Sequence, residues 1–152
     1  MELLLAGLNH KSGVPASARD NLAAVGAHEF LRRLSEAGWA EAVVLSTCNR
    51  LEVYAAIGES GAVQAGCRAA RTRPDALARI LESAAGSPLG GHLYLRSGFD
   101  AARHLFAVAS GIDSLVVGEN EILGQVKTAY ETAFAAGTTG KLTNIIFQRA
   151  IF

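Results

Sequence analysis

The chain has 152 residues, of which 50% are apolar and 18% charged, and its fourteen basic residues balance fourteen acidic ones. This composition is typical of a globular domain, and a chain of this length can fold without a disulfide or a metal. Because the net charge is zero, a surface that binds nucleic acid through bulk positive charge alone is excluded.

The composition also argues against a membrane or metal protein. The opening MELLLAGLNH lacks the basic region of a signal sequence, and no apolar run approaches the ~20 residues of a membrane span. The two cysteines, Cys48 and Cys67, and the four histidines lack the spacing of zinc ligands. We therefore expect a soluble, cytoplasmic protein with reduced thiols and no metal.

The apolar pattern predicts strands and helices that alternate along the chain. In chain order the expected elements are a strand at 2–10, a short helix from Ser17, a helix at 27–38 that ends at Gly38, strands at 41–47 and 50–58, an Ala-rich helical segment at 61–86 that breaks near Pro74, a strand at 91–98, and helices at 97–111, 119–137 and 141–152. The strand at 50–58 alternates apolar and polar residues, which predicts one exposed face.

The order β-α-β-β-α-β, followed by helices, predicts an α+β fold. It is typical of the ferredoxin-like, split βαβ plan, with helices on one face of the sheet and additional C-terminal helices. We expect residues 1–140 to form one functional domain and residues 141–152 to begin a connecting helix. Because the last helix ends on Ile151 and Phe152 without a cap, we also expect the natural chain to continue.

The segment VVLSTCNRLEVY, residues 43–54, contains the most distinctive chemistry of the sequence. Cys48 follows a strand, and in an extended backbone Arg50 would project to the same side. A nearby guanidinium can stabilise a nucleophilic thiolate or bind a carboxylate. Thr47 and Asn49 add short polar groups. The alternative is a buried structural cysteine beside a surface arginine, and these residues alone leave both readings open.

The predicted helix at 97–111 carries a second candidate, His104. It lies at the border of an expected core stripe formed by Phe99, Ala102, Phe106 and Ala109, which Leu105 and Val108 extend. Asp100, four residues earlier, is placed to orient the imidazole ring. His104 is therefore either a structural residue or an acid–base group near a thiol.

Each of the predicted helices at 97–111 and 119–137 has one further feature. In the helix at 97–111, Ser97 and Asp100 have the spacing of a capping box. In the later helix, Glu121 and Gln125 belong to a polar stripe that also contains Thr128 and Thr132. The stripe could contact an amino acid or a ribose, although a carboxylate in a first turn is also explained by the helix dipole.

Three segments together resemble the glutamyl-tRNA reductase family. They are GLNHKSGVPAS near the start, LSTCNRLEVYA in the middle and HLFAVASGIDSLVVGENEILGQVKTAY later. The resemblance covers nearly the whole chain in order, and it implies the N-terminal catalytic domain, which recognises glutamate. It further implies that the NADPH-binding and dimerisation domains are absent from this chain, in agreement with the absence of a Gly-rich phosphate loop after any predicted strand.

The resemblance implies a role for each matching residue. Cys48 would attack glutamyl-tRNA to give a thioester, which NADPH reduces to glutamate-1-semialdehyde in tetrapyrrole synthesis. His104 would support activity. The matching substrate-binding positions are Thr47, Asn49, Arg50, Ser114, Glu119, Asn120, Glu121 and Gln125. The family's usual Gly-Glu-Pro-Gln is here Gly118-Glu119-Asn120-Glu121, so an amide is replaced by a carboxylate at Glu121.

The expected partners follow from the same resemblance. They are glutamyl-tRNA, with glutamate-1-semialdehyde aminomutase as a further candidate. The full-length enzyme would form a homodimer through a domain missing here, so we expect this fragment to be monomeric. The alternative to an enzyme is a non-catalytic ferredoxin-like module that binds aminoacyl-tRNA or a partner protein. Under that alternative, replacing Cys48 would change no measurable property.

Overall fold

The computed structural model describes residues 1–57, 74–112 and 121–152. The elements within these residues are β1 (Leu4–Asn9), α1 (Ala16–Glu36), β2 (Glu41–Ser46), β3 (Arg50–Ala56), α3 (Pro74–Ala85), a 3-10 turn (Gly90–His92), β4 (Tyr94–Ser97), α4 (Phe99–Ala109), α5 (Glu121–Ala135) and α6 (Lys141–Ile151). The four predicted strands are therefore confirmed, close to their expected bounds. The predicted helical region before residue 74, which includes Cys67, lies outside the described residues.

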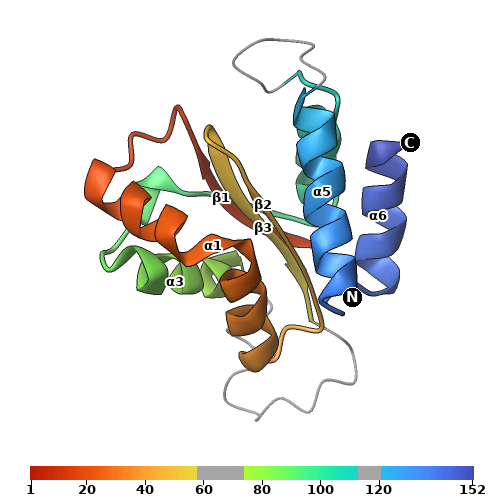
Figure 1. The fold of residues 1–152 in the computed structure, drawn as a ribbon, viewed down its shortest axis with the longest axis horizontal. Coiled ribbons are helices and arrows are strands. Elements are labelled where there is room, and N and C mark those ends of the chain that lie inside the picture. Colours follow the sequence, from red (N-terminus) through yellow and green to blue (C-terminus); the bar gives the residue numbers. More distant parts are fainter. Residues whose placement is uncertain (58–73, 113–120) are drawn as a thin grey trace.

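The four strands form one antiparallel sheet in the order β2-β3-β1-β4 (Figure 1). β3 lies between β1 and β2 and runs antiparallel to both. β1 and β2 therefore point in the same direction, with α1 as the connection between them. The α+β class is confirmed by this sheet and by the helices that pack on it.

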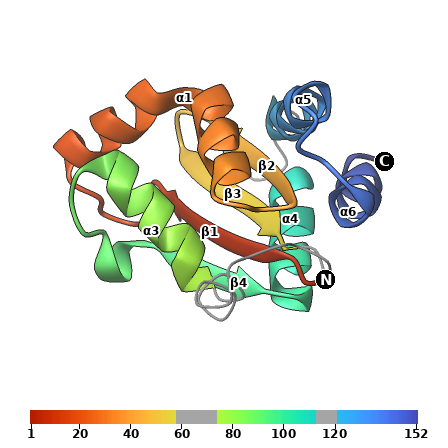
Figure 2. The same ribbon diagram turned by 90° about the horizontal axis from the view of Figure 1, so that it is seen from below.

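Helices cover both faces of the sheet, as Figures 1 and 2 show. α1 and α3 lie on one face, α4 and α6 lie on the other, and α5 runs along the edge strand β2. The ferredoxin-like plan with helices on one face is therefore wrong in its helical layers, because the apolar sides of the later helices bury the second face. No helix in the described part of the chain is long and apolar enough to cross a bilayer.

β3 is buried along its whole length, which corrects the prediction of one exposed face. Tyr54 packs edge-on against Phe147 of α6, with ring centroids 5.4 Å apart. The alternate residues, such as Val53, point toward α1 and α3. Polar residues on β3 are therefore covered by protein instead of water, and Arg50 is only 3% exposed.

α1 is two helical segments joined at Gly26, whose φ of 78° is left-handed. This break separates the short helix and the helix at 27–38 that the sequence predicts. Pro15, rather than Ser17, precedes the first turn, and it makes no side-chain cap. Gly38, with φ of 93°, follows the last turn as predicted.

α4 differs from its prediction in both its start and its buried face. Gly98 precedes the first turn without a side-chain hydrogen bond, so the expected capping box at Ser97 is wrong. The expected core stripe is also wrong in part, because Phe99 is 91% exposed and Phe106 is 41% exposed. Leu105, Val108 and Ala109 are buried as expected, and Ala101 is buried as well.

α6 is attached to the sheet through a buried carboxylate. Glu41 at the start of β2 is 2% exposed. Its Oε1 accepts hydrogen bonds from the backbone N–H of Thr143, at 3.1 Å, and from the Thr143 hydroxyl, at 3.0 Å. The first turn of α6 is thereby fixed to the edge strand, in direct contact with the domain that residues 1–140 were expected to form.

Candidate active site

The connection between β2 and β3 is a tight turn that exposes Cys48. The backbone N–H of Thr47 donates to the carbonyl oxygen of Arg50 at 2.9 Å. The Thr47 hydroxyl oxygen accepts from the backbone N–H groups of Asn49, at 3.1 Å, and Arg50, at 3.2 Å. Thr47 thus shapes the turn through bonds that any Ser or Thr can make. Because residues 47–49 form a turn, the alternation of an extended strand does not apply to Cys48.

The Cys48 side chain borders a pocket of about 260 Å³, here called the Cys48 pocket. The thiol is free and exposed, so it is not sealed in the core. The lining residues are Leu8, Asn9, His10, Arg19, Asp20, Leu22, Ala23, Ser46, Thr47, Cys48, Asn49, Arg50 and Leu51. The four candidates of the TCNR segment are therefore brought together. His10, Arg19 and Asp20, at the end of β1 and the start of α1, were not among the predicted site residues.

Glu52 contacts several polar side chains on the face of the sheet that α4 covers. Its side chain is fully buried, and its Oε2 lies 3.5 Å from Nη1 of the buried Arg50. The Tyr54 hydroxyl donates to Oε1 at 3.0 Å, and the Tyr94 hydroxyl donates to Oε2 at 2.6 Å. Sequence reasoning missed Glu52, although its position two residues after Arg50 on one strand could have indicated it.

His104 belongs to this buried cluster and does not line the Cys48 pocket. Its Nε2 hydrogen-bonds with Oε2 of Glu52, and its ring lies 5.1 Å from that of Tyr94. The ring is therefore oriented by Glu52, and not by Asp100 as the sequence suggested. Cys48 and Arg50 share one pocket, whereas His104 is linked to Arg50 through Glu52.

Because Gly7 of β1 has no side chain, the side chains of Glu52 and Tyr94 fit beside it. It pairs with Glu52 on one side and with Tyr94 on the other. A Cβ there would lie 2.8 Å from Cε2 of Tyr94 and 3.0 Å from Cγ of Glu52. We expect Gly7→Ala to lower the free energy of unfolding by about 1–3 kcal/mol, because the buried ring and carboxylate must move.

Urea unfolding of both proteins measures this effect, and Gly124→Ala in α5 is the matched control. A Cβ at Gly124 meets nothing within 4 Å, so the control should be neutral or stabilising by up to about 1 kcal/mol. Equal stability changes for the two variants would contradict the packing at Gly7.

Burial raises the pKa of Tyr54 well above its usual value, and the neighbouring Glu52 carboxylate adds to the effect. In the unfolded chain the phenol ionises near pH 10, whereas in the folded protein it stays neutral. The free energy of unfolding should therefore decrease as the pH rises above about 10. Tyr54→Phe should have a smaller alkaline slope in urea unfolding between pH 8 and 11. Identical slopes would refute this assignment.

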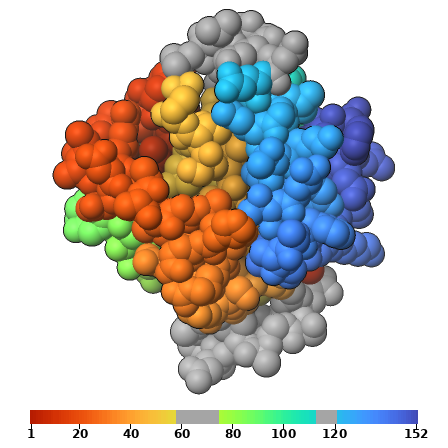
Figure 3. All heavy atoms as spheres, in the orientation of Figure 1, coloured from red at the N-terminus to blue at the C-terminus, as the bar shows by residue number. Residues whose placement is uncertain are grey.

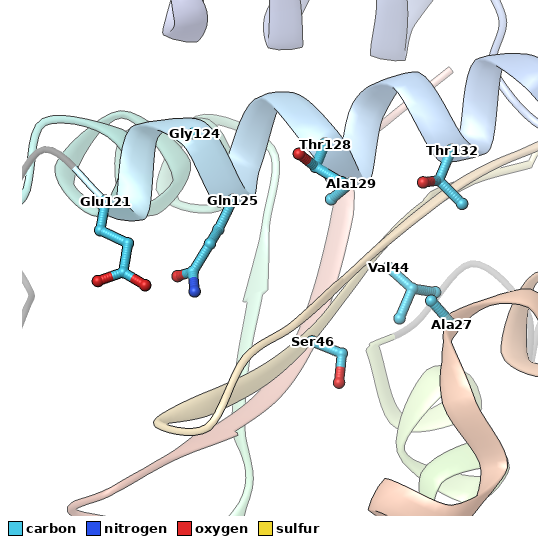
Figure 4. Close-up of a pocket in the computed structure, with 9 residues that line it drawn as sticks. All are labelled: Ala27, Val44, Ser46, Glu121, Gly124, Gln125, Thr128, Ala129 and Thr132. Carbon is cyan, nitrogen blue, oxygen red and sulfur yellow. The ribbon is translucent and has the colours of Figure 1, made fainter.

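A second depression, here called the α5 groove, lies between α1 and α5. Figure 3 shows strand residues at the surface between these helices. The groove has a volume of about 510 Å³, and Figure 4 shows its lining. Those residues are Ala27, Val44, Ser46, Glu121, Gly124, Gln125, Thr128, Ala129 and Thr132. The polar stripe predicted for α5 therefore faces this groove.

The two depressions meet at Ser46, which lines both. Glu121 and Gln125 project from the first turns of α5, and Ser46 lies at the end of β2 (Figure 4). The candidates of both segments thus line two depressions that share Ser46. Ser114, Glu119 and Asn120 lie outside the described residues.

The described residues do not fit a dinucleotide or a metal. The connection from β1 to α1, residues 10–15, contains one glycine and lacks the Gly-rich turn that holds a pyrophosphate. No group of three His, Cys, Asp or Glu side chains within residues 1–57, 74–112 and 121–152 could hold a metal ion. What this part of the chain offers chemically is a thiol beside polar and cationic groups.

Comparison with known proteins gives a consistent result. The family described as "Glutamyl-tRNAGlu reductase, N-terminal domain" matches residues 6–152. Glutamyl-tRNA reductase of Moorella thermoacetica is 41% identical over 155 residues, which cover 100% of this chain and 33% of that protein. The enzyme of the same name from Magnetococcus marinus is 41% identical over 155 residues, with 99% and 34% covered.

A solved structure agrees with the sequence relatives. "Glutamyl-tRNA Reductase from Methanopyrus kandleri" superposes with a TM-score of 0.75 at 34% identity, over 98% of this chain and 32% of that one. The chain therefore spans about a third of the length of these relatives. It belongs to the family of glutamyl-tRNA reductase N-terminal domains.

Proposed function

We propose that this chain captures the glutamyl group of glutamyl-tRNA as a thioester on Cys48. The sulfur attacks the ester carbonyl carbon, a sulfur–carbon bond forms, and the bond to the ribose oxygen breaks. The thiol proton is transferred to the departing ribose hydroxyl, so the products are a glutamyl thioester and free tRNA. The observation that carries this proposal is the exposed thiol of Cys48 at the mouth of a polar pocket.

The proposed substrate contacts follow from the two depressions. Arg50 lines the Cys48 pocket, and its guanidinium, which is buried beside Glu52 in this structure, would bind the side-chain carboxylate of glutamate. Thr47 and Asn49 border the same pocket, while Glu121 and Gln125 border the α5 groove. Glu121 would favour the substrate ammonium group, because a carboxylate attracts that charge. We further propose Ser114, Glu119 and Asn120 as contacts on the basis of the family motif alone.

His104 would act in this reaction as a positioning residue. Its hydrogen bond to Glu52 helps to fix that carboxylate, which in turn lies beside the Arg50 guanidinium. A disturbance of His104 would therefore affect carboxylate binding before it affects the thiol. This role is consistent with its place outside the Cys48 pocket.

The remaining steps of the family reaction belong to parts of the protein beyond these residues. Reduction of the thioester to glutamate-1-semialdehyde requires NADPH, for which the described residues have no binding turn. We propose that the 152-residue chain stops at the thioester, or hydrolyses it slowly when water reaches it. Dimerisation, contact with glutamate-1-semialdehyde aminomutase and a cytoplasmic location are proposed for the full-length protein.

Trapping the acyl-enzyme tests this function directly. The chain is incubated with tRNA that carries radiolabelled glutamate, quenched in acid and analysed for protein-bound label. We expect label that hydroxylamine releases, because a thioester is cleaved by that nucleophile. A full-length relative, such as the Moorella thermoacetica protein, serves as the positive control.

The same experiment separates the enzyme from a binding module. A module would bind glutamyl-tRNA without acquiring label at any thiol. If the full-length relative is labelled and this chain is not, the proposed capture step is wrong for this chain.

A further inference from the structure

The strand register places His10 and Cys48 in the lining of the same pocket. Asn9, the last residue of β1, pairs with Arg50, the first residue of β3. His10 follows Asn9 directly, and Cys48 precedes Arg50 by two residues. Both side chains line the Cys48 pocket, although 38 positions separate them in the sequence (48 − 10). The register thus brings an imidazole and a thiol to the same end of the sheet.

The backbone around His10 is fixed by its neighbours. The backbone N–H of Asn9 donates to the Ser12 hydroxyl at 3.0 Å, and the N–H of Ser12 donates to the Asn9 carbonyl at 3.0 Å. The N–H of Lys11 donates to the Asn9 side chain at 2.9 Å. These bonds hold the turn that presents His10, so the imidazole has a defined starting position.

The imidazole itself is not used in holding the fold. Its Nδ1 is buried and has no hydrogen-bond partner among the described residues. A buried polar atom without a partner needs an explanation, and a catalytic role is one of the recognised explanations. The residue is half-buried and borders the pocket, so its imidazole is placed to exchange a proton there.

Two other histidines near this region are already engaged. His104 hydrogen-bonds with Glu52, and Nδ1 of His92 hydrogen-bonds with the carbonyl oxygen of Ser12 at 2.9 Å; neither residue lines the Cys48 pocket. The remaining lining residues with ionisable side chains are Arg19, Asp20 and Arg50. Of these groups and His10, only an imidazole both accepts and donates a proton readily near neutral pH.

We propose that His10 is the proton-transfer residue for Cys48, an inference that rests on the proposed capture of the glutamyl group. His10 accepts the thiol proton as the sulfur–carbon bond forms. It then donates that proton to the ribose oxygen as the ester bond breaks. The imidazole returns to its starting state, and no other reactant is needed.

Acylation in a single turnover tests this role in the 152-residue chain and, at the corresponding histidine, in a full-length relative. His10→Gln should slow the labelling of Cys48 by roughly 10²- to 10⁴-fold, the usual contribution of a general acid–base. His28→Gln is the matched control, because His28 is exposed on α1 and lines neither depression. A rate for His10→Gln within threefold of wild type overturns the proposal.

Alkylation of Cys48 by iodoacetamide tests the pair even if no acyl-enzyme forms. The rate is followed between pH 5 and 10, with the modified peptide identified by mass spectrometry. We expect the wild-type thiol to be alkylated at least about tenfold faster than the thiol of His10→Gln at pH 7, because the imidazole can accept the thiol proton. Superimposable curves overturn the proposal, whereas failure of the capture step alone leaves them different.

A measurement that leaves His10 in place covers the case in which His10→Gln does not fold. The Cε1 proton of His10 is titrated by NMR in wild type and in Cys48→Ser. We expect its titration curve to change when the thiol is removed. Identical curves would mean that the two side chains do not interact, and the proposal would be wrong.

Discussion

Replacing Cys48 by serine is expected to abolish the acyl-enzyme. The thiolate is the nucleophile in such reactions, and a serine hydroxyl stays protonated and attacks poorly without a dedicated base. We expect the labelling rate to fall by roughly 10³-fold or more, which corresponds to about 4 kcal/mol of transition-state stabilisation. Because Cys48 is exposed and forms no disulfide, the substitution should leave the melting temperature unchanged.

Acid-quenched labelling with glutamyl-tRNA measures this effect. Cys67→Ser is the matched control, since it removes the second thiol of the chain, at a position outside the described residues. Labelling should persist in the control and disappear in Cys48→Ser. If Cys48→Ser retains its label, another residue carries the glutamyl group.

Replacing Glu52 by leucine is expected to destabilise the fold by about 3–5 kcal/mol. The change removes the carboxylate partner of the buried Arg50 and of the Tyr54 and Tyr94 hydroxyls. Breaking a buried charge pair on one side costs this much because the remaining charge stays desolvated. It is a large fraction of the total stability of a small domain, which is about 5–15 kcal/mol.

Urea unfolding measures the change, and the control is a surface pair of the same chemistry. Glu36→Gln on α1 removes a partner of Arg32 at a site where both side chains are more than half exposed. It should leave the stability almost unchanged, because solvent screens an exposed ion pair. Glu52→Gln should fall between the two, because its amide oxygen still accepts from tyrosine. A loss below about 1 kcal/mol in Glu52→Leu would contradict the proposed importance of the cluster.

The fold class could be predicted because its signals are local. Apolar runs of strand length, punctuated by residues such as Gly38, located all four strands and the main helices. The layers could not be predicted in the same way. A buried strand such as β3 shows the same alternation whether its polar side meets water or a second layer of helices. Arg50 and Glu52 are polar residues on its covered face.

The candidate site was likewise predictable only where its residues are close together in the sequence. The TCNR segment is contiguous, so its turn chemistry was visible in the sequence, and the register of β1 then added His10 to it. His104 was found as a candidate, but its partner was not. The hydrogen bond between His104 and Glu52 joins residues 52 positions apart in the sequence, and the one between Tyr94 and Glu52 joins residues 42 positions apart. No local pattern encodes which carboxylate such a residue will meet.

The sequence alone therefore determined the thiol with its polar neighbours and the polar stripe of α5, because each depends on residues within one or two turns of the chain. The tertiary structure decided that Ser46 joins two depressions and that Glu52 connects His104 to Arg50. It also placed His10 and Cys48 in the lining of one pocket. These relations depend on strand register and on the packing of both faces, where burial selects partners that are distant in sequence.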